Sequence, residues 1–213
     1  MSTQHQELYW HRFSIDRVLP AIILVCVAML ALPLNASGDE QVASQLPAAK
    51  QTTLGLYVTS KEAYEKWRAA PEDVTIIDVR TPEEYLFIGH AEMAWNIPLA
   101  EQLYKWDAEK AQFPMHPLPD FVDRVKQFAR PDDVLLVMCR SGGRSAMAVN
   151  LLAKAGFKNV YNITDGVEGD VVKDPNSVFN GQRLVNGWKN SGLPWTYDIN
   201  PDRLITKRTR NSD

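Results

Sequence analysis

The sequence predicts an α/β fold in which a central parallel sheet is flanked by helices on both faces. Short β-branched apolar runs alternate along the chain with segments of helical pattern. The β-branched run over 74–80 and the continuous apolar run over 134–138 are typical of buried strands. A chain that alternates strand and helix joins parallel strands through helical crossovers, so these observations together indicate the layered α/β class.

The predicted helices and strands lie between residues 60 and 163. Ser60 is the predicted N-cap of the first helix, and Thr81 with Pro82 begins the second, because proline is favoured in a first helical turn. Gly156 is expected to end the last long helix. The expected strands are 74–80, 94–98, 134–138 and 159–163; the expected helices are 61–70, 99–110, 120–129 and 144–155, and a further helix is expected to begin over 81–84.

The composition fits a globular protein with a sizeable core. The 213 residues allow one ordinary domain with an appendage, or two small domains, and 45% of them are hydrophobic. The chain has 23 basic and 26 acidic residues and no long basic run. We therefore expect no nucleic-acid partner.

Residues 1–38 differ from the rest and are predicted to be a signal peptide or a signal anchor. Arg12 and Arg17 precede an uncharged apolar run over 18–34, and small polar residues follow it. This order is typical of a secretory signal, although a run of 17 residues is also at the lower limit for a spanning helix. Both alternatives place the later residues outside the cytoplasm. We expect an exported, periplasmic protein that contacts the membrane only through 18–34, if that segment is not cleaved.

The remainder divides into a linker over 39–52, a domain over 53–200 and a C-terminal tail over 201–213. The chain has two cysteines, and Cys26 lies in the apolar segment, so Cys139 is the one thiol of the expected exported domain. It has no partner there for an intramolecular disulfide. In an oxidising compartment such a thiol is either bonded to another molecule or free and reactive.

Cys139 directly follows the predicted strand over 134–138, and a helix is predicted to begin a few residues later. In open α/β sheets ligands bind at this edge. Gly142 and Gly143 allow the loop to turn its amides inward, and Arg140 and Arg144 add positive charge that favours a thiolate. The alternative is a buried structural cysteine followed by an ordinary turn.

The spacing from cysteine to arginine restricts the kinds of reaction that the loop suits. Cys139 and Arg144 form C-x4-R, whereas the loop of cysteine-dependent phosphatases is C-x5-R and would require arginine at Ser145. A tighter loop suits a single sulfur atom on the cysteine better than a tetrahedral phosphate. The spacing therefore argues against a phosphatase.

The loop sequence CRSGGRS is similar to the active-site loop of rhodaneses, which are thiosulfate:cyanide sulfurtransferases. Further matching segments occur in the family's order over roughly 55–195, and the resemblance implies the rhodanese fold. These segments are Asp78-Val79-Arg80, Pro82-Glu83-Glu84-Tyr85, Gly89-His90-Ala91, Asn96-Ile97-Pro98 and Gly192-Leu193-Pro194.

The resemblance implies a sulfurtransferase that moves sulfane sulfur through a persulfide on Cys139. The donor would be thiosulfate or a persulfide, and the acceptor cyanide, a small thiol or a protein thiol. A sulfane-sulfur carrier without turnover is the alternative. Asp78 and Arg80 would support the loop, and His90 would be structural. No cofactor is implied, and the dispersed histidines predict no metal site. The residues expected to bind the substrate are Arg140, Ser141, Gly142, Gly143, Arg144 and Ser145.

The chain departs from the family pattern late in the domain. Met93 and Asp165 each stand where glycine is usual, and a 19-residue insertion, Gly169–Gly187, follows Asp165-Gly166-Val167-Glu168. Because the insertion follows a strand of the same sheet, we expect it beside Cys139, where it would shape access to the thiol. Lys173 and Arg183 are its predicted charged contacts. The alternative is a surface elaboration without function.

Overall fold

The computed structural model of the chain describes residues 45–205. The predicted signal or anchor segment over 1–38 and the last eight residues of the predicted tail lie outside this range. Within the described part, no helix is both long and apolar enough to span a bilayer.

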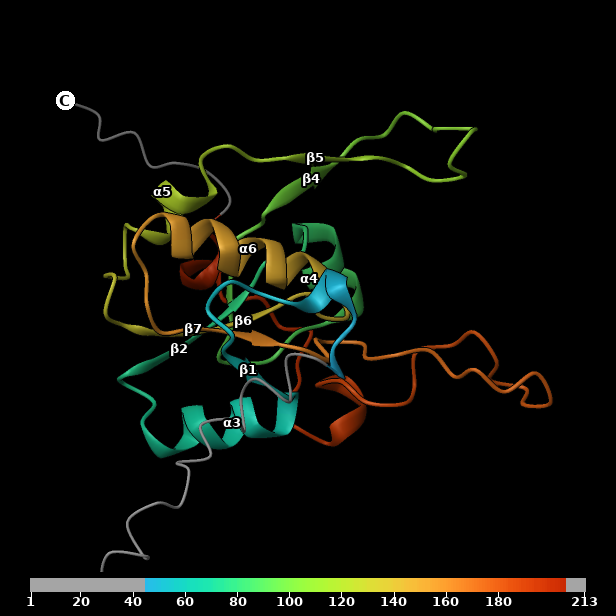
Figure 1. Cartoon of the computed structure of the whole chain (residues 1–213). Coiled ribbons are helices and arrows are strands. Elements are labelled where there is room, and N and C mark those ends of the chain that lie inside the picture. The colour runs from blue at the N-terminus through green and yellow to red at the C-terminus, as the bar shows by residue number, and fades with distance from the viewer. Residues whose placement is uncertain (1–44, 206–213) are drawn as a thin grey trace, which may run out of the picture. The chain divides into compact units, whose positions relative to one another are not determined.

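A five-stranded parallel sheet forms the centre of the domain, with the strand order β1-β7-β6-β2-β3 (Figure 1). The sheet confirms the predicted parallel arrangement, and β6 has the predicted bounds. The strands are β1 (Tyr57–Val58), β2 (Val74–Asp78), β3 (Trp95–Asn96), β6 (Val134–Met138) and β7 (Val160–Ile163).

Helices cover both faces of this sheet, as predicted. Figure 1 shows α3 on one side and α6 with α5 on the other. The α-helices of the described residues are α3 (Ser60–Ala69), α4 (Pro82–Ile88), α5 (Phe121–Val125) and α6 (Gly143–Lys154), with short 3-10 turns η1 (Ala48–Lys50), η2 (Lys189–Ser191) and η3 (Pro201–Arg203).

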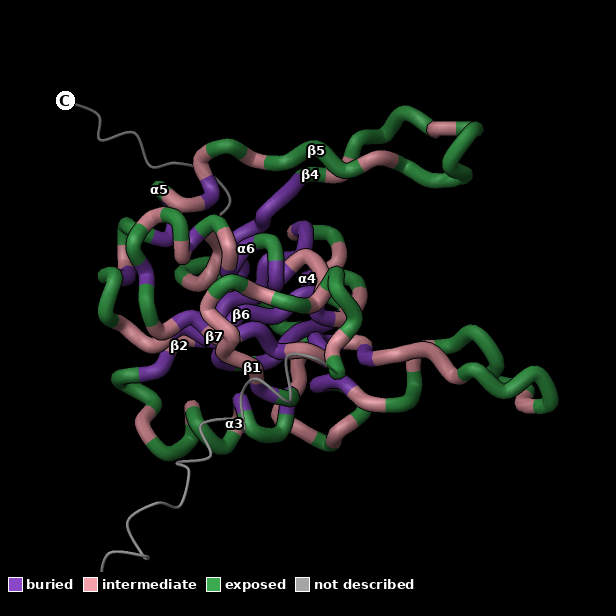
Figure 2. Tube along the Cα trace, in the orientation of Figure 1, coloured by how far each residue is buried: buried purple, intermediate pink, exposed green. Residues whose placement is uncertain are grey.

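The alternation of side chains along β6 divides the core in two. Leu135 and Val137 pack with α5 and α6, while Leu136 and Met138 face the opposite side with α3. This is the period of two that a strand imposes. Because both faces are covered, the whole strand is apolar and β6 is buried (Figure 2). Cys139, which directly follows the strand, is still part of the buried core.

Two helix starts illustrate how local sequence sets the boundaries. Helix α4 begins where it was predicted, with Pro82 in its first turn; Thr81 is its cap, and Glu84 completes a capping box. The cap of α3 is Thr59 rather than the predicted Ser60, because Thr59 and Glu62 form a second capping box. Ser60 is instead fully buried, and its hydroxyl donates to Asp165.

The prediction of a helix over 99–110 is wrong. Ala100–Gln102 is strand β4, which pairs antiparallel with β5 (Met115–Pro117) in a projecting hairpin (Figure 1). The Leu99 amide donates to the Val79 carbonyl, so the chain leaves the sheet already extended. Helical propensity is a weak preference, and this long-range pairing overrides it.

The described domain reaches beyond the expected bounds of 53–200 at both ends. The Lys50 carbonyl, in the expected linker, accepts a hydrogen bond from Asn162 of β7. In the expected tail, the Ile205 amide donates to Asn96 of β3, and its carbonyl accepts from buried Arg124. Lys50 therefore bonds to a side chain of β7, and Ile205 bonds to the backbone of the edge strand β3.

Candidate active site

Cys139 lies at the carboxyl end of β6, between β2 and β7, and is a free thiol that is only 2% exposed. The loop that follows turns back over it and enters α6 at Gly143. The Gly142 amide donates to the Cys139 sulfur at 3.2 Å. The thiol therefore sits under its own loop, beside a backbone donor and the positive end of a helix.

Two glycines allow this loop to pack as closely as it does. Gly142 has φ +97°, and a Cβ there would lie 2.3 Å from the Thr164 carbonyl oxygen. Gly166 has φ +61°, and a Cβ there would lie 2.4 Å from the Cys139 carbonyl oxygen. The next amide, that of Val167, donates to this same carbonyl at 2.8 Å. The segment after β7 thus holds the Cys139 loop by direct backbone contact.

Ser145, in the first turn of α6, connects the thiol to β7. Its hydroxyl lies 3.5 Å from the Cys139 sulfur and 2.6 Å from the Asn162 side-chain oxygen, to which it donates. The Asn162 amide in turn donates to the Gly142 carbonyl at 3.1 Å. Sequence reasoning missed Asn162, although a side-chain amide within the predicted strand over 159–163 was a usable signal.

Arg144 does not face open solvent but forms a two-point ion pair with Glu84 of α4, with both N–O distances at 2.6 Å. Burial of Glu84 opposes its ionisation, but hydrogen bonds and charge from Arg144 outweigh this and lower the pKa of Glu84. Arg140 is exposed. Sequence reasoning could not tell which arginine points inward, and it missed Glu84.

Asp78 and Arg80, the predicted support of the loop, form an ion pair with both side chains fully buried. Arg80 Nη2 lies 2.6 Å from the Asp78 carboxylate and also donates to the Gly89 carbonyl, and Nη1 donates to the Glu84 carbonyl at 3.4 Å. The pair therefore holds both ends of α4. It acts on the Cys139 loop through α4, since α4 carries the Glu84 that binds Arg144.

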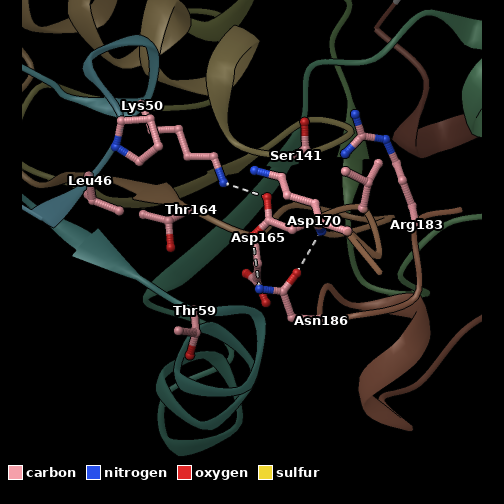
Figure 3. Close-up of a pocket in the computed structure, with 12 residues that line it drawn as sticks. Leu46, Lys50, Thr59, Ser141, Thr164, Asp165, Asp170, Arg183 and Asn186 are labelled. Atoms are coloured by element: carbon pink, nitrogen blue, oxygen red, sulfur yellow. Dashed lines mark hydrogen bonds and ion pairs between the residues drawn. The ribbon is translucent and has the colours of Figure 1, made fainter. Parts of the chain in front are cut away.

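The insertion extends away from the sheet on the other side of the loop and is largely exposed (Figure 2). Its two ends are joined at the base, where Val171 and Arg183 form an antiparallel bridge. Asp170 accepts from Lys50 at 3.0 Å and from Asn186 at 3.1 Å (Figure 3). Lys50, which sequence reasoning missed, ties the insertion to the segment before β1.

Asp165, which stands where the family usually has glycine, holds the start of this segment. Its carboxylate accepts from the Ser60 amide and hydroxyl, both at 2.8 Å, and from the Gly187 amide at 3.0 Å. It therefore joins α3 to the far end of the insertion. The departure from the family pattern serves to close the base of the inserted loop.

Two further predictions concern residues away from the loop. His90 is buried, stacks on Tyr85 with ring centroids 3.6 Å apart, and has a pKa lowered first by burial. This packing suits a structural residue. Among residues 45–205, no group of three His, Cys, Asp or Glu side chains is arranged to hold a metal ion.

Comparison with known proteins places the fold and the loop in a family. A model of the Rhodanese-like domain matches residues 60–171. An uncharacterised protein of Rickettsia prowazekii is 33% identical over 122 residues, covering 57% of this chain and 82% of the relative. The chloroplastic thiosulfate sulfurtransferase 16 of Arabidopsis thaliana is 38% identical over 90 residues, covering 42% of this chain and 68% of the relative.

Solved structures are also similar. The crystal structure of Rv0390 from M. tuberculosis has a TM-score of 0.49 at 24% identity, covering 66% of this chain and 96% of the other. The match to the family model extends over more than half of the 213 residues and includes β2, β6, β7 and the whole Cys139 loop. The chain belongs to the rhodanese-like domain family.

Proposed function

We propose that this protein is a sulfurtransferase that carries sulfane sulfur as a persulfide on Cys139. The observation that supports this most directly is the Gly142 amide aimed at the Cys139 sulfur at 3.2 Å, in a loop that begins a 12-residue helix. Membership of the rhodanese-like family and relatives named as thiosulfate sulfurtransferases support a sulfurtransferase role.

In the first step the Cys139 thiolate attacks the outer sulfur of thiosulfate. A new S–S bond forms, the bond to the sulfonate sulfur breaks, and sulfite leaves with the bonding electron pair. The product is a cysteine persulfide with one negative charge, so charge is conserved. A nucleophile activated by its surroundings is what this covalent step requires.

The neighbours of the sulfur suit both forms of this cycle. A hydroxyl group can donate only one proton. Ser145 donates its proton to the side-chain oxygen of Asn162 at 2.6 Å, while the Ser145 oxygen lies 3.5 Å from the Cys139 sulfur. Rotation about the Cβ–Oγ bond of Ser145 directs this proton to the negatively charged sulfur instead. The Gly142 amide needs no such rotation, so it stabilises the anion from the start.

In the second step an acceptor attacks the outer sulfur of the persulfide. With cyanide, thiocyanate forms and leaves, and the Cys139 thiolate returns, so no oxidant or reductant is consumed. Cys139 is only 2% exposed, so the proposal includes a movement of the loop over 140–143 that admits donor and acceptor.

We also propose that the protein acts outside the cytoplasm, from the charge and apolar pattern of residues 1–38. In an oxidising compartment a lone thiol without a resolving cysteine suits sulfur transfer better than reversible disulfide chemistry. The acceptor there is a small thiol or a protein thiol.

The test is thiocyanate formation from thiosulfate and cyanide, with intact-mass measurement of the protein after incubation with thiosulfate alone. We expect the mass to rise by one sulfur atom, and both this adduct and turnover to vanish in Cys139→Ser. An adduct on Cys139 without turnover on any acceptor would favour the sulfur carrier. No adduct from thiosulfate or from a persulfide donor, in a folded protein, would refute the proposal.

A further inference from the structure

A cavity of about 670 Å³ lies beside the loop that carries Cys139. Its lining comes from the segment over 46–50, Thr59 before α3, Ser141 of the loop, Thr164 and Asp165 after β7, and both ends of the insertion (Figure 3). Protein sites for small molecules typically occupy roughly 300–1,000 Å³. Thiosulfate and cyanide are far smaller than this, so the cavity has room for a larger molecule.

The charges around the cavity do not cancel. Lys50, Lys173 and Arg183 contribute three positive charges, and Asp165 and Asp170 two negative ones, which leaves a net charge of plus one (3 − 2). Among residues 45–205, neither Lys173 nor Arg183 forms an ion pair within 4.0 Å. These two cations are therefore available to an anionic ligand.

The acidic groups of the cavity are already bound. Burial opposes the ionisation of Asp170, but hydrogen bonds from Lys50 and Asn186 and the charge of Arg183 lower its pKa. Asp165 accepts three hydrogen bonds from Ser60 and Gly187. Arg183 donates one N–H to the Gly169 carbonyl at 2.6 Å, which fixes the direction of its guanidinium; within residues 45–205 its other N–H groups have no hydrogen-bond partner. A planar guanidinium held in this way suits a carboxylate.

Ser141 connects this cavity to the chemistry, because it is two residues from Cys139 and lines the cavity. We propose that the cavity binds a peptide-sized thiol that carries carboxylates, or the persulfide of that thiol, with its sulfur toward the Cys139 loop. This proposal rests on the proposed function, since it names the molecule with which Cys139 exchanges sulfur.

The exchange balances in both directions. As donor, the bound persulfide is attacked at its outer sulfur by the Cys139 thiolate, the S–S bond breaks, and the thiolate of the ligand leaves with the bonding pair. As acceptor, the ligand thiolate attacks the outer sulfur of the Cys139 persulfide and departs as a persulfide anion. No additional oxidant or reductant takes part.

Binding is tested first, without sulfur chemistry. S-methylglutathione, a peptide-sized thioether with two carboxylates, is titrated calorimetrically into Cys139→Ser. We expect Arg183→Gln and Lys173→Gln in that background each to weaken binding about tenfold, the loss of one charge-assisted hydrogen bond. The matched control Lys126→Gln removes an exposed lysine beside α5 and is expected to leave binding unchanged. Thermal unfolding of each variant verifies that it is folded.

Sulfur transfer from thiosulfate is then compared for glutathione, 2-mercaptoethanol and cyanide. We expect Arg183→Gln to lower the ratio of kcat/KM for glutathione over 2-mercaptoethanol about tenfold, while Lys126→Gln leaves it unchanged. No binding to folded Cys139→Ser, or equal binding in all variants, overturns the cavity proposal. Binding that depends on Arg183 in a protein without any sulfur transfer would instead refute the proposed function and leave the binding site standing.

Discussion

The Cys139 loop contacts charged groups on two sides that are built differently. On the α4 side, Arg80 is paired with Asp78 and Arg144 with Glu84, so every cation has its own carboxylate. The insertion side holds Lys50, Asp170, Lys173 and Arg183; Lys50 and Asp170 pair with each other, whereas Lys173 and Arg183 form no ion pair within residues 45–205. The arginines on the α4 side are therefore paired with carboxylates, whereas the insertion side carries unpaired positive charge.

This difference indicates which charged residues position the Cys139 loop and which recognise an anionic ligand. An arginine that shares both its terminal nitrogens with a carboxylate has little left for a substrate anion, so Arg144 holds the loop against α4. The free cations lie on a segment that the family pattern lacks. Recognition of an anionic ligand is therefore expected from the insertion side, and stability of the loop from the α4 side.

The largest effect is expected from the buried pair on the α4 side. Asp78→Asn leaves Arg80 charged and fully buried without a counter-ion, which should lower the free energy of unfolding by about 3–5 kcal/mol. Chemical denaturation measures the loss. Asp132→Asn, which breaks an exposed pair with Lys158, is the control and should change almost nothing. Equal effects of the two substitutions would show that the buried pair does not hold α4.

A smaller effect is expected where the insertion side meets the loop. Gly166→Ala introduces both left-handed strain and a clash with the Cys139 carbonyl, with an expected cost of about 2–4 kcal/mol. Gly55→Ala is a close match, since φ is +65° there and +61° at Gly166, but a Cβ at Gly55 has open space. It should cost only the strain, about 1–2 kcal/mol. Similar losses in the two variants would mean that the loop yields to the extra methyl group.

The smallest effect is expected at the partly exposed pair between Glu84 and Arg144. Glu84→Gln should cost about 1 kcal/mol at neutral pH and also slow sulfur transfer by loosening the loop. The pKa of Glu84 lies below its ordinary 4.5 in the folded protein, so the stabilisation is complete above pH 4.5 and is lost as the pH falls through the folded value.

Denaturation of the wild type and of Glu84→Gln between pH 7 and pH 3 measures this contribution. The two curves should converge as the pH falls, because protonation of Glu84 makes the wild type resemble the variant. Lys50→Gln breaks the corresponding pair on the insertion side and should have the weaker effect, since the Asp170 side chain is 47% exposed. Curves that stay parallel would contradict the role of the Glu84 charge.

Local sequence carried the features that depend on near neighbours. The apolar run over 134–138 is a strand because its side chains are buried on both faces, and Cys139 follows at its carboxyl end. Thr81 and Pro82 begin α4 because the capping hydrogen bonds lie within four residues. The loop motif then identified both the reactive thiol and the family that the chain resembles.

The tertiary structure alone decided which distant groups meet around that loop. Asn162, Glu84 and Lys50 are 23, 55 and 89 residues from Cys139, and no local pattern ties them to it. Ala100–Gln102 became a strand through pairing with Met115–Pro117, against its helical pattern. Contacts between residues close in the chain depend on local backbone geometry, which the local sequence determines. The partners of a charged group or a side-chain amide depend instead on how the sheet brings the ends of distant strands together.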